Sequence, residues 1–302
     1  FSFFVYISIS KNQVIKDRLV HYFVLSIYLN LFIVTVFNFI NWDLKFIDTE
    51  EIKRFKGYLN ILTILVLILP FIKKTKMNIV AYLFLIPNLW LSNCNSAILG
   101  ILIALIALSV FYIYQNIFRF KILFYALFFI ALTLSSQILL NLPENLDKES
   151  IQTQKFIVPT FLVDVHRQYI WSFSIKKISE KPLLGYGPDT SNFIEGSQEI
   201  IGSKYTGTMP YIPSHPHNFI LEIILDTGLI GLAGFIFFIF YFNFKIFRKS
   251  DDKGKFLLIL FFFYFWGSSL VNFSFWLGWW QVSYFFITSL ISSINLSKNQ
   301  KT

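Results

Sequence analysis

Arg167 and His217 are the side chains in this sequence best suited to act on a charged or hydroxylated substrate. Arg167 is the only arginine between about 141 and 226, and a guanidinium can hold a phosphate or pyrophosphate through two parallel hydrogen bonds. An imidazole, with an ordinary pKa of about 6.5, can take a proton from a sugar hydroxyl or bond a phosphate. Two structural alternatives stay open. Arg167 could pair with Asp164 or reach lipid headgroups, and His217 could be a hydrogen-bonded packing residue.

The segment around Arg167 is predicted to be an amphipathic helix on or near a membrane surface. It runs from Asp164 to Lys181, and Pro182 ends it because the residue before proline leaves the helical region. Trp171 is expected at the headgroup level. Gly185 and Gly187 then indicate a tight turn. Apolar or small residues recur at helical spacing: Ile170, Trp171, Ser174, Ile175 and Ile178.

A second helix is predicted from about Ser214 to Gly234. Pro216 favours its first turn, with Ser214 or His215 as the cap. One face would carry His217, Leu221, Ile224, Gly228 and Gly231, and the two glycines would let another helix approach closely. The neighbouring stripe is polar: Asn218, Glu222 and Asp226. These two acids are either general-base candidates or only a polar helix face. His215 and His217 lack a third ligand for a metal site.

Composition places these segments in a membrane protein. Hydrophobic residues make up 55% of the 302 residues and charged residues 14%, against about 25% charged in soluble domains, and the mean hydropathy is +0.61. A soluble enzyme, a disordered tail and a nucleic-acid-binding domain are therefore excluded, and one cysteine excludes an intramolecular disulfide. About eight spans are expected, so the fold class is an all-α polytopic bundle: 20–40, 57–72, 78–92, 96–114, 121–140, 227–247, 255–271 and 276–294.

The loops between these spans have their net excess of basic residues on one side of the membrane. Lysine and arginine collect in 11–18, 73–77, 115–121, 245–255 and the C-terminal tail, which marks that side as cytoplasmic. Three regions follow: N-terminal spans over 1–140, a long external loop over 141–226 containing short helices, and C-terminal spans over 227–302. The start at Phe1 rather than Met indicates a fragment.

The histidine motif resembles a family signature. His217-Asn218, nine residues and then Gly228-Leu-Ile-Gly231 is similar to the H-[NSQ]-x9-G-x-x-G pattern of the O-antigen ligase family, which also includes O-antigen polymerases. The R-x-x-x-W run from Arg167 to Trp171 and the P-L-L-G-Y-G-P run over 182–188 resemble the family's loop before this histidine. The resemblance covers about 160–247 and gives Gly185, Gly187, Gly228 and Gly231 structural roles.

The resemblance implies a GT-C-like glycosyltransferase of the bacterial inner membrane with a periplasmic active loop. It would transfer a glycan from undecaprenyl diphosphate to a hydroxyl of a glycan or lipid A core acceptor, with inversion and with neither metal nor cofactor. His217 would activate or orient the acceptor, and Arg167 would engage the pyrophosphate. Asn218, His215, Lys176 and Lys177 are the expected substrate-binding residues. Membrane lipid is the expected surrounding partner, and no nucleic acid is involved.

One position departs from the family pattern, and other functions stay open. Where the family commonly has a second arginine, this sequence has Asn93 or Asn95. Either a lysine takes that place, or the donor is held differently, or the chain is not active as a ligase. The candidate lysines are Lys53, Lys56, Lys176 and Lys177. A polymerase of the same family is the first alternative. A non-enzymatic transporter of polysaccharide intermediates is the second, although the near absence of charges within the spans disfavours it. A structural subunit is the third.

Overall fold

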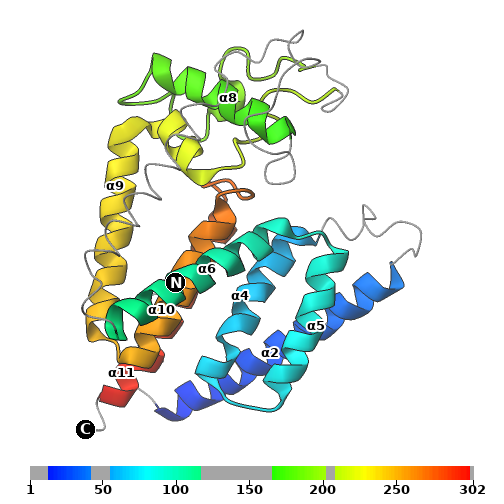
Figure 1. The fold of residues 1–302 in the computed structure, drawn as a ribbon, viewed down its shortest axis with the longest axis vertical. Coiled ribbons are helices and arrows are strands. Elements are labelled where there is room, and N and C mark those ends of the chain that lie inside the picture. The colour runs from blue at the N-terminus through cyan, green and yellow to red at the C-terminus, as the bar shows by residue number, and fades with distance from the viewer. Residues whose placement is uncertain (1–12, 42–54, 117–164, 202–207, 300–302) are drawn as a thin grey trace. The chain divides into compact units, whose positions relative to one another are not determined.

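The computed structural model describes residues 13–41, 55–116, 165–201 and 208–299, and the regular elements within these ranges are helices (Figure 1). The only β pairing among the described residues is an isolated bridge between Ile200 and Pro210. The all-α prediction is therefore confirmed for the described residues. The helices are α2 (Gln13–Ile40), α4 (Lys56–Ile72), α5 (Met77–Leu91), α6 (Asn95–Asn116), α8 (Val165–Glu180), the 3-10 turn η3 (Ser191–Phe193), α9 (Phe219–Lys249), α10 (Asp252–Ser269) and α11 (Gly278–Asn299).

The chain divides into two compact units. The first contains residues 1–109, 241–269 and 277–302, and the second contains residues 110–240 and 270–276. The second unit therefore carries α8, most of α9 and the short connection between α10 and α11. Arg167 and His217 both belong to it.

The first unit is a helical bundle whose buried polar groups pair with one another. Helices α2, α4 and α5 pack together, and α10 packs against α4 and α11 (Figure 1). The Asn38 amide of α2 donates to Asn88 Oδ1 of α5 at 2.7 Å, and the Tyr264 hydroxyl of α10 donates to the Asn60 carbonyl of α4 at 2.8 Å. Such pairing is needed where water is absent, because an unsatisfied polar group in hydrocarbon is costly.

Seven of the eight expected spans coincide with described helices, and the eighth, 121–140, lies outside the described residues. Among the helices that the structure describes, three are long and apolar enough to cross a membrane: Asp17–Ile40, Asn95–Tyr114 and Phe219–Lys249. Helices α4 and α5 are apolar but shorter, as their sequences indicated. The count of about eight spans stays a prediction. Pro87 does not end α5, which continues to Leu91.

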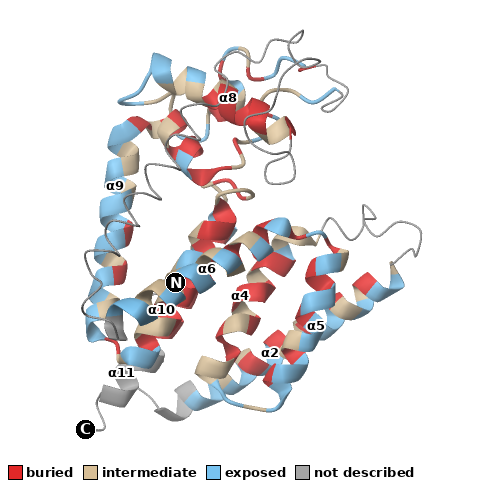
Figure 2. Ribbon diagram, in the orientation of Figure 1, coloured by how far each residue is buried: buried red, intermediate tan, exposed pale blue. Residues whose placement is uncertain are grey.

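In the second unit, α8 is packed into a small core rather than lying exposed on a surface. It begins at Val165 and ends at Glu180, close to the predicted bounds. Its buried positions lie between Val165 and Ser174 and include every residue from 168 to 172, so this part of the helix is buried on all sides (Figure 2). Trp171 is only 7% exposed and packs with Ile170, Ile194, Ile212, Leu221 and Leu225. The ring of Trp171 thus fills a protein core, and its position at the headgroup level stays a prediction.

Helix α9 is broken at Gly228, and backbone groups of the Pro182–Gly187 turn form hydrogen bonds with those of α9 on both sides of the break. Gly228 has φ +69° and ψ −174°, which interrupts the helical hydrogen bonds. On one side of the break, the Leu225 and Asp226 carbonyls accept from the N–H groups of Tyr186 at 2.9 Å and Gly187 at 2.8 Å. On the other side, the N–H groups of Leu229 and Ile230 donate to the Pro182 and Leu183 carbonyls at 2.9 and 3.3 Å.

The two glycines of the histidine motif, Gly228 and Gly231, therefore serve a different contact from the predicted approach of another helix. A Cβ at Gly228 would collide with the Leu183 carbonyl, so this glycine admits a turn and not another helix. At Gly231 a Cβ would collide with the Thr227 side chain. Gly185, at φ +67°, lies against the Leu225 and Asp226 backbone. The P-L-L-G-Y-G run and the G-x-x-G run are thus two halves of one backbone junction.

This junction predicts unequal effects for two glycines of α9. Gly228→Ala should lower the free energy of unfolding by about 3 kcal/mol, because it combines an unfavourable φ with a backbone collision. Gly234→Ala is the matched control, since a Cβ there meets nothing within 4 Å, and it should change stability by less than about 1 kcal/mol. Thermal unfolding of the two detergent-solubilised variants measures the difference. Equal midpoints would contradict the role of Gly228.

Candidate active site

The histidine segment precedes α9 and is held outside the helix by a cap. Asn218 Oδ1 accepts from the N–H groups of Ile220 at 3.0 Å and Leu221 at 3.2 Å, so α9 begins at Phe219 and Asn218 is its N-cap. The predictions that Pro216 opens the helix and that His217 shares a helical face with Leu221 were wrong. His217 instead has φ +54°, a left-handed conformation that non-glycine residues rarely adopt and that is over-represented at functional sites.

One backbone carbonyl fixes the protonated nitrogens of both histidines. The Asn272 carbonyl lies 2.7 Å from His215 Nε2 and 3.1 Å from His217 Nδ1. Because a carbonyl oxygen only accepts hydrogen bonds, both of these nitrogens carry hydrogens. Neutral His217 therefore has its lone pair on Nε2, and neutral His215 has its lone pair on Nδ1, 2.9 Å from the Ser214 hydroxyl. The two rings stand 4.1 Å apart between centroids.

Arg167 reaches this pair because α8 is tied to the residue between the histidines. The Trp171 indole donates to the Pro216 carbonyl at 3.0 Å, and Arg167 lies one turn earlier on α8. The positive charge of Arg167 lowers the pKa of both His215 and His217. The structure thus places Arg167 close enough to both imidazoles for its charge to act on them, and the roles of Arg167 and His217 stay predictions.

Burial keeps His217 in the neutral form. Desolvation is the largest cause, and the charges of His215, Arg167 and His166 add to it, so the pKa of His217 falls to about 4 despite the opposing hydrogen bond to Asn272. The pKa of His215 is also lowered, first by burial. At neutral pH, His217 is therefore a hydrogen-bond acceptor through Nε2 and not a cation.

Glu222 and Asp226 are fully buried and hold the connection between α10 and α11. Glu222 accepts from the Ser274 hydroxyl and the Phe275 N–H, both at 2.6 Å. Asp226 accepts from the Trp276 indole at 2.7 Å and from the Asp189 N–H at 3.1 Å. Their hydrogen bonds go to protein groups, which supports a structural use of the polar stripe rather than the general-base alternative.

Sequence reasoning missed the 270–276 connection, which supplies the Asn272 carbonyl. The span predictions 255–271 and 276–294 left only a few residues between them, and no residue type there indicates a site. The indirect signal was the stripe of Glu222 and Asp226, because buried carboxylates need hydrogen-bond donors from elsewhere in the chain.

The structure does not bring all of the other predicted substrate-binding residues to the histidine pair. Lys177 pairs with Glu180 at 3.1 Å and lies ten residues along α8 from Arg167, a rise of about 15 Å. Lys176 is exposed. Asn218 uses its Oδ1 for the cap, so substrate binding by Asn218, Lys176 and Lys177 stays a prediction. Asp164, the alternative partner of Arg167, and Lys53 lie outside the described residues.

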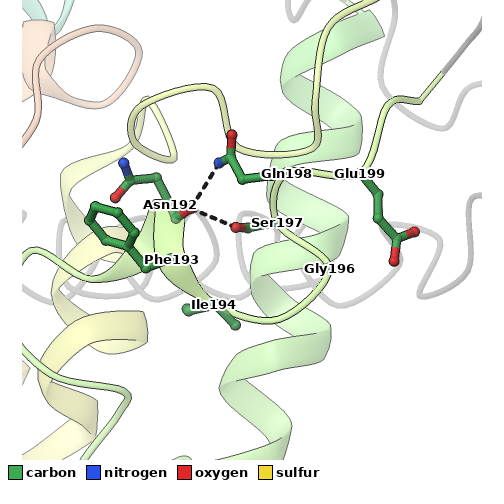
Figure 3. Close-up of a pocket in the computed structure, with 7 residues that line it drawn as sticks. All are labelled: Asn192, Phe193, Ile194, Gly196, Ser197, Gln198 and Glu199. Atoms are coloured by element: carbon green, nitrogen blue, oxygen red, sulfur yellow. Dashed lines mark hydrogen bonds between the residues drawn. The ribbon is translucent and has the colours of Figure 1, made fainter.

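A hollow of about 470 Å³ opens in the loop that precedes the histidine segment (Figure 3). Its lining residues are Asn192, Phe193, Ile194, Gly196, Ser197, Gln198 and Glu199. The Asn192 carbonyl accepts from the Ser197 hydroxyl and the Gln198 amide, both at 2.8 Å. Phe193 is 80% exposed. Gln198 also donates to the Ile212 carbonyl at 2.8 Å, which joins the hollow to the chain five residues before His217.

The depressed pKa of His217 predicts a pH-dependent stability. Between about pH 4 and the ordinary value of about 6.5, the unfolded chain binds more protons than the folded one, so stability falls as the pH is lowered through this window. Replacing His217 by Gln removes that contribution. Wild type should therefore lose more of its thermal midpoint between about pH 7 and pH 4.5 than His217→Gln does. His21→Gln, at an exposed position of α2, is the control and should behave as wild type, and equal losses in all three proteins would contradict the assignment.

Comparison with known proteins agrees with the motif. The family model described as O-antigen ligase matches residues 80–236, more than half of the chain. This range includes α5, α6, α8, the histidine segment and the broken start of α9. No solved structure matches the chain.

Curated relatives carry related names. Proteins named "Putative polysaccharide ligase" from Rickettsia conorii, Rickettsia prowazekii and Rickettsia typhi are 32%, 30% and 29% identical over 140, 150 and 172 residues. These alignments cover 46%, 49% and 57% of this chain and 32%, 35% and 42% of the relatives. The chain thus matches less than half the length of each of these relatives. The extent of the family match shows that the chain belongs to the O-antigen ligase family.

Proposed function

We propose that this chain is the catalytic part of an inner-membrane glycosyltransferase of the polysaccharide ligase type. It transfers a glycan from undecaprenyl diphosphate to a sugar hydroxyl at the periplasmic face. The observation that carries the proposal is the pairing of a neutral His217, with its Nε2 lone pair available, with the positive charge of Arg167. The excess of basic residues in the loops of the opposite side supports a periplasmic location for this site.

His217 acts on the acceptor. The acceptor hydroxyl donates its hydrogen bond to Nε2, which turns an oxygen lone pair toward the anomeric carbon of the donor. As the new C–O bond forms on the face opposite the pyrophosphate, the hydroxyl proton becomes acidic and passes to the imidazole. The neighbouring charge of Arg167 disfavours an imidazolium, so the proton is released rapidly afterwards.

Arg167 acts on the donor. Departure of the diphosphate develops negative charge on its bridging oxygen, and a guanidinium can neutralise this charge while holding two oxygens in a fixed geometry. A lysine in the same place would supply a point charge without that bidentate geometry. The two side chains therefore divide the reaction between acceptor and leaving group.

The hollow in the loop that precedes the histidine segment is the proposed binding site for a sugar ring of the glycan. Phe193 offers an exposed aromatic face, and the Asn192 amide, the Gln198 amide oxygen and the Glu199 carboxylate offer polar groups for sugar hydroxyls. Its connection to Ile212 places it within about 17 Å of His217 along an extended chain. That separation suits a sugar a few residues away from the reacting one.

Two substitutions test the division of roles. His217→Ala and Arg167→Ala should each lower transfer from a synthetic undecaprenyl-diphosphate glycan by about 100-fold or more, because each removes a group used in the transition state. Arg167→Lys should keep part of the activity. The controls are His21→Ala and Arg248→Ala, which should match wild type. Product formation by the purified protein is the measurement, and full activity in both test variants would contradict the proposal.

The same assay separates the functions within and outside the family. A ligase attaches the glycan to a lipid A core acceptor, whereas a polymerase extends a second lipid-linked glycan. Translocation of the donor lipid without any product would favour the transporter alternative.

If the hollow binds a sugar ring, a substitution in it should weaken substrate binding without slowing the chemical step. Phe193→Ala should raise KM for the glycan substrate several-fold with little change in kcat, because binding away from the reacting bond is lost equally from the ground and transition states. Leu184→Ala removes another highly exposed apolar side chain of the same unit and is the control. A fall in kcat with KM unchanged would argue against a binding role for Phe193.

A further inference from the structure

The two buried carboxylates of α9 hold a segment that itself holds the histidines. Glu222 bonds the Ser274 hydroxyl and the Phe275 N–H, and the Ser274 oxygen in turn accepts from the Trp276 N–H at 3.1 Å. Asn272, two residues before Ser274, presents its carbonyl to both imidazoles. Glu222 is thus connected to His217 by its hydrogen bonds to Ser274 and Phe275, the backbone of 272–275, and the hydrogen bond from His217 to the Asn272 carbonyl.

We propose that Glu222 is a positioning residue that, through Ser274 and Phe275, fixes the Asn272 carbonyl and so selects the tautomer of His217 with hydrogen on Nδ1 and the lone pair on Nε2. The consequence for catalysis rests on the proposed function, because only a glycosyl transfer needs that lone pair. The selection of the tautomer does not rest on it and can be measured without any substrate.

The chemistry of Glu222 matches this task better than a packing role does. Burying a carboxylate costs several kcal/mol of solvation free energy unless donors satisfy it. An apolar residue would fill the same space without this loss. A carboxylate, however, accepts on both oxygens, and here one oxygen takes a hydroxyl and the other a backbone N–H. Two bonds at adjacent residues fix both the position and the direction of the backbone between them and Asn272.

The groups around His217 make the tautomer sensitive to this carbonyl. His215 lies on the same segment, His166 and Arg167 lie on α8, and all three charges lower the pKa of His217. Asp189, in the loop before η3, acts in the opposite sense on His215. The Asn272 carbonyl is the described hydrogen-bond partner of the His217 ring. If this carbonyl moves, the ring loses the contact that distinguishes Nδ1 from Nε2.

The test is nitrogen NMR of the protein in lipid nanodiscs with ¹⁵N-labelled histidine. The chain has four histidines, so few signals arise, and His217→Gln identifies those of His217 by their loss. In wild type, Nδ1 should be protonated and Nε2 unprotonated across the neutral range, because Asn272 fixes the tautomer. The variant is Glu222→Gln, whose one amide oxygen can accept only one of the two bonds and whose NH₂ meets a donor.

In folded Glu222→Gln, both nitrogens of His217 should move toward the averaged shifts of exchanging tautomers, and the pKa of His217 should not rise, because the weakened hydrogen bond to Asn272 is a contact that raises it. Ser274→Ala removes one bond and keeps the Phe275 N–H bond, so it should shift the signals in the same direction by less. Glu195→Gln, an exposed glutamate of the same unit, is the matched control and should leave them unchanged.

Wild-type signals in folded Glu222→Gln would overturn the proposal. If that variant does not fold, Ser274→Ala decides in its place, and unchanged His217 signals there would overturn it equally. Failure of transfer activity in wild type would count against the proposed function and leave the NMR result standing. In an active enzyme, Glu222→Gln should lower kcat with little change in KM and move the acidic limit of activity downward in pH, whereas a packing defect that admits water to His217 would move it upward.

Discussion

The carbonyl oxygen of Asn272 is the contact on which the site depends. It accepts from His215 and His217 at once, and an acceptor with no donor of its own leaves each imidazole a single tautomer. Buried imidazoles that are neutral and fixed in this way expose one lone pair in a known direction. The connection between α10 and α11 is therefore as much a part of the site as the histidine motif itself.

The recurrent sequence runs of this chain correspond to anchors rather than to separate sites. Trp171 secures the segment between the two histidines, and the Pro182–Gly187 turn secures the break in α9 at Gly228. Asn218 caps the helix that follows, and Glu222 secures the segment that carries Asn272. The Trp171, Pro182–Gly187 and Glu222 anchors each bond a main-chain group far away in the sequence, whereas Asn218 bonds the N–H groups two and three residues after it.

The sequence predicted those features that depend on neighbouring residues, such as the bounds of α8. It did not predict contacts made to a main-chain atom far away in the sequence. Pro182 and the apolar spacing were enough to place α8 to within a residue or two. Pro216 gave a helix-start signal that the stronger cap at Asn218 overrode, so His217 was assigned to the wrong conformation. Gly228 was interpreted as a site of close helix packing. A position that needs a positive φ also selects glycine, so the residue type alone could not distinguish the two uses. The Asn272 contact joins residues 55 apart through a carbonyl that every residue possesses, so no pattern could reveal it.

The most direct test of the account is the position of a bound diphosphate lipid relative to Arg167. Dipolar recoupling between the phosphorus atoms of an unreactive undecaprenyl-diphosphate analogue and the ¹⁵N-labelled guanidinium groups measures it in nanodiscs. A bidentate contact predicts a phosphorus–nitrogen separation of about 4 Å to Arg167, lost in Arg167→Lys, while His217 stays neutral. Strong coupling to another arginine, or coupling unchanged by Arg167→Lys, would contradict the assignment of Arg167 and His217 to one reaction centre.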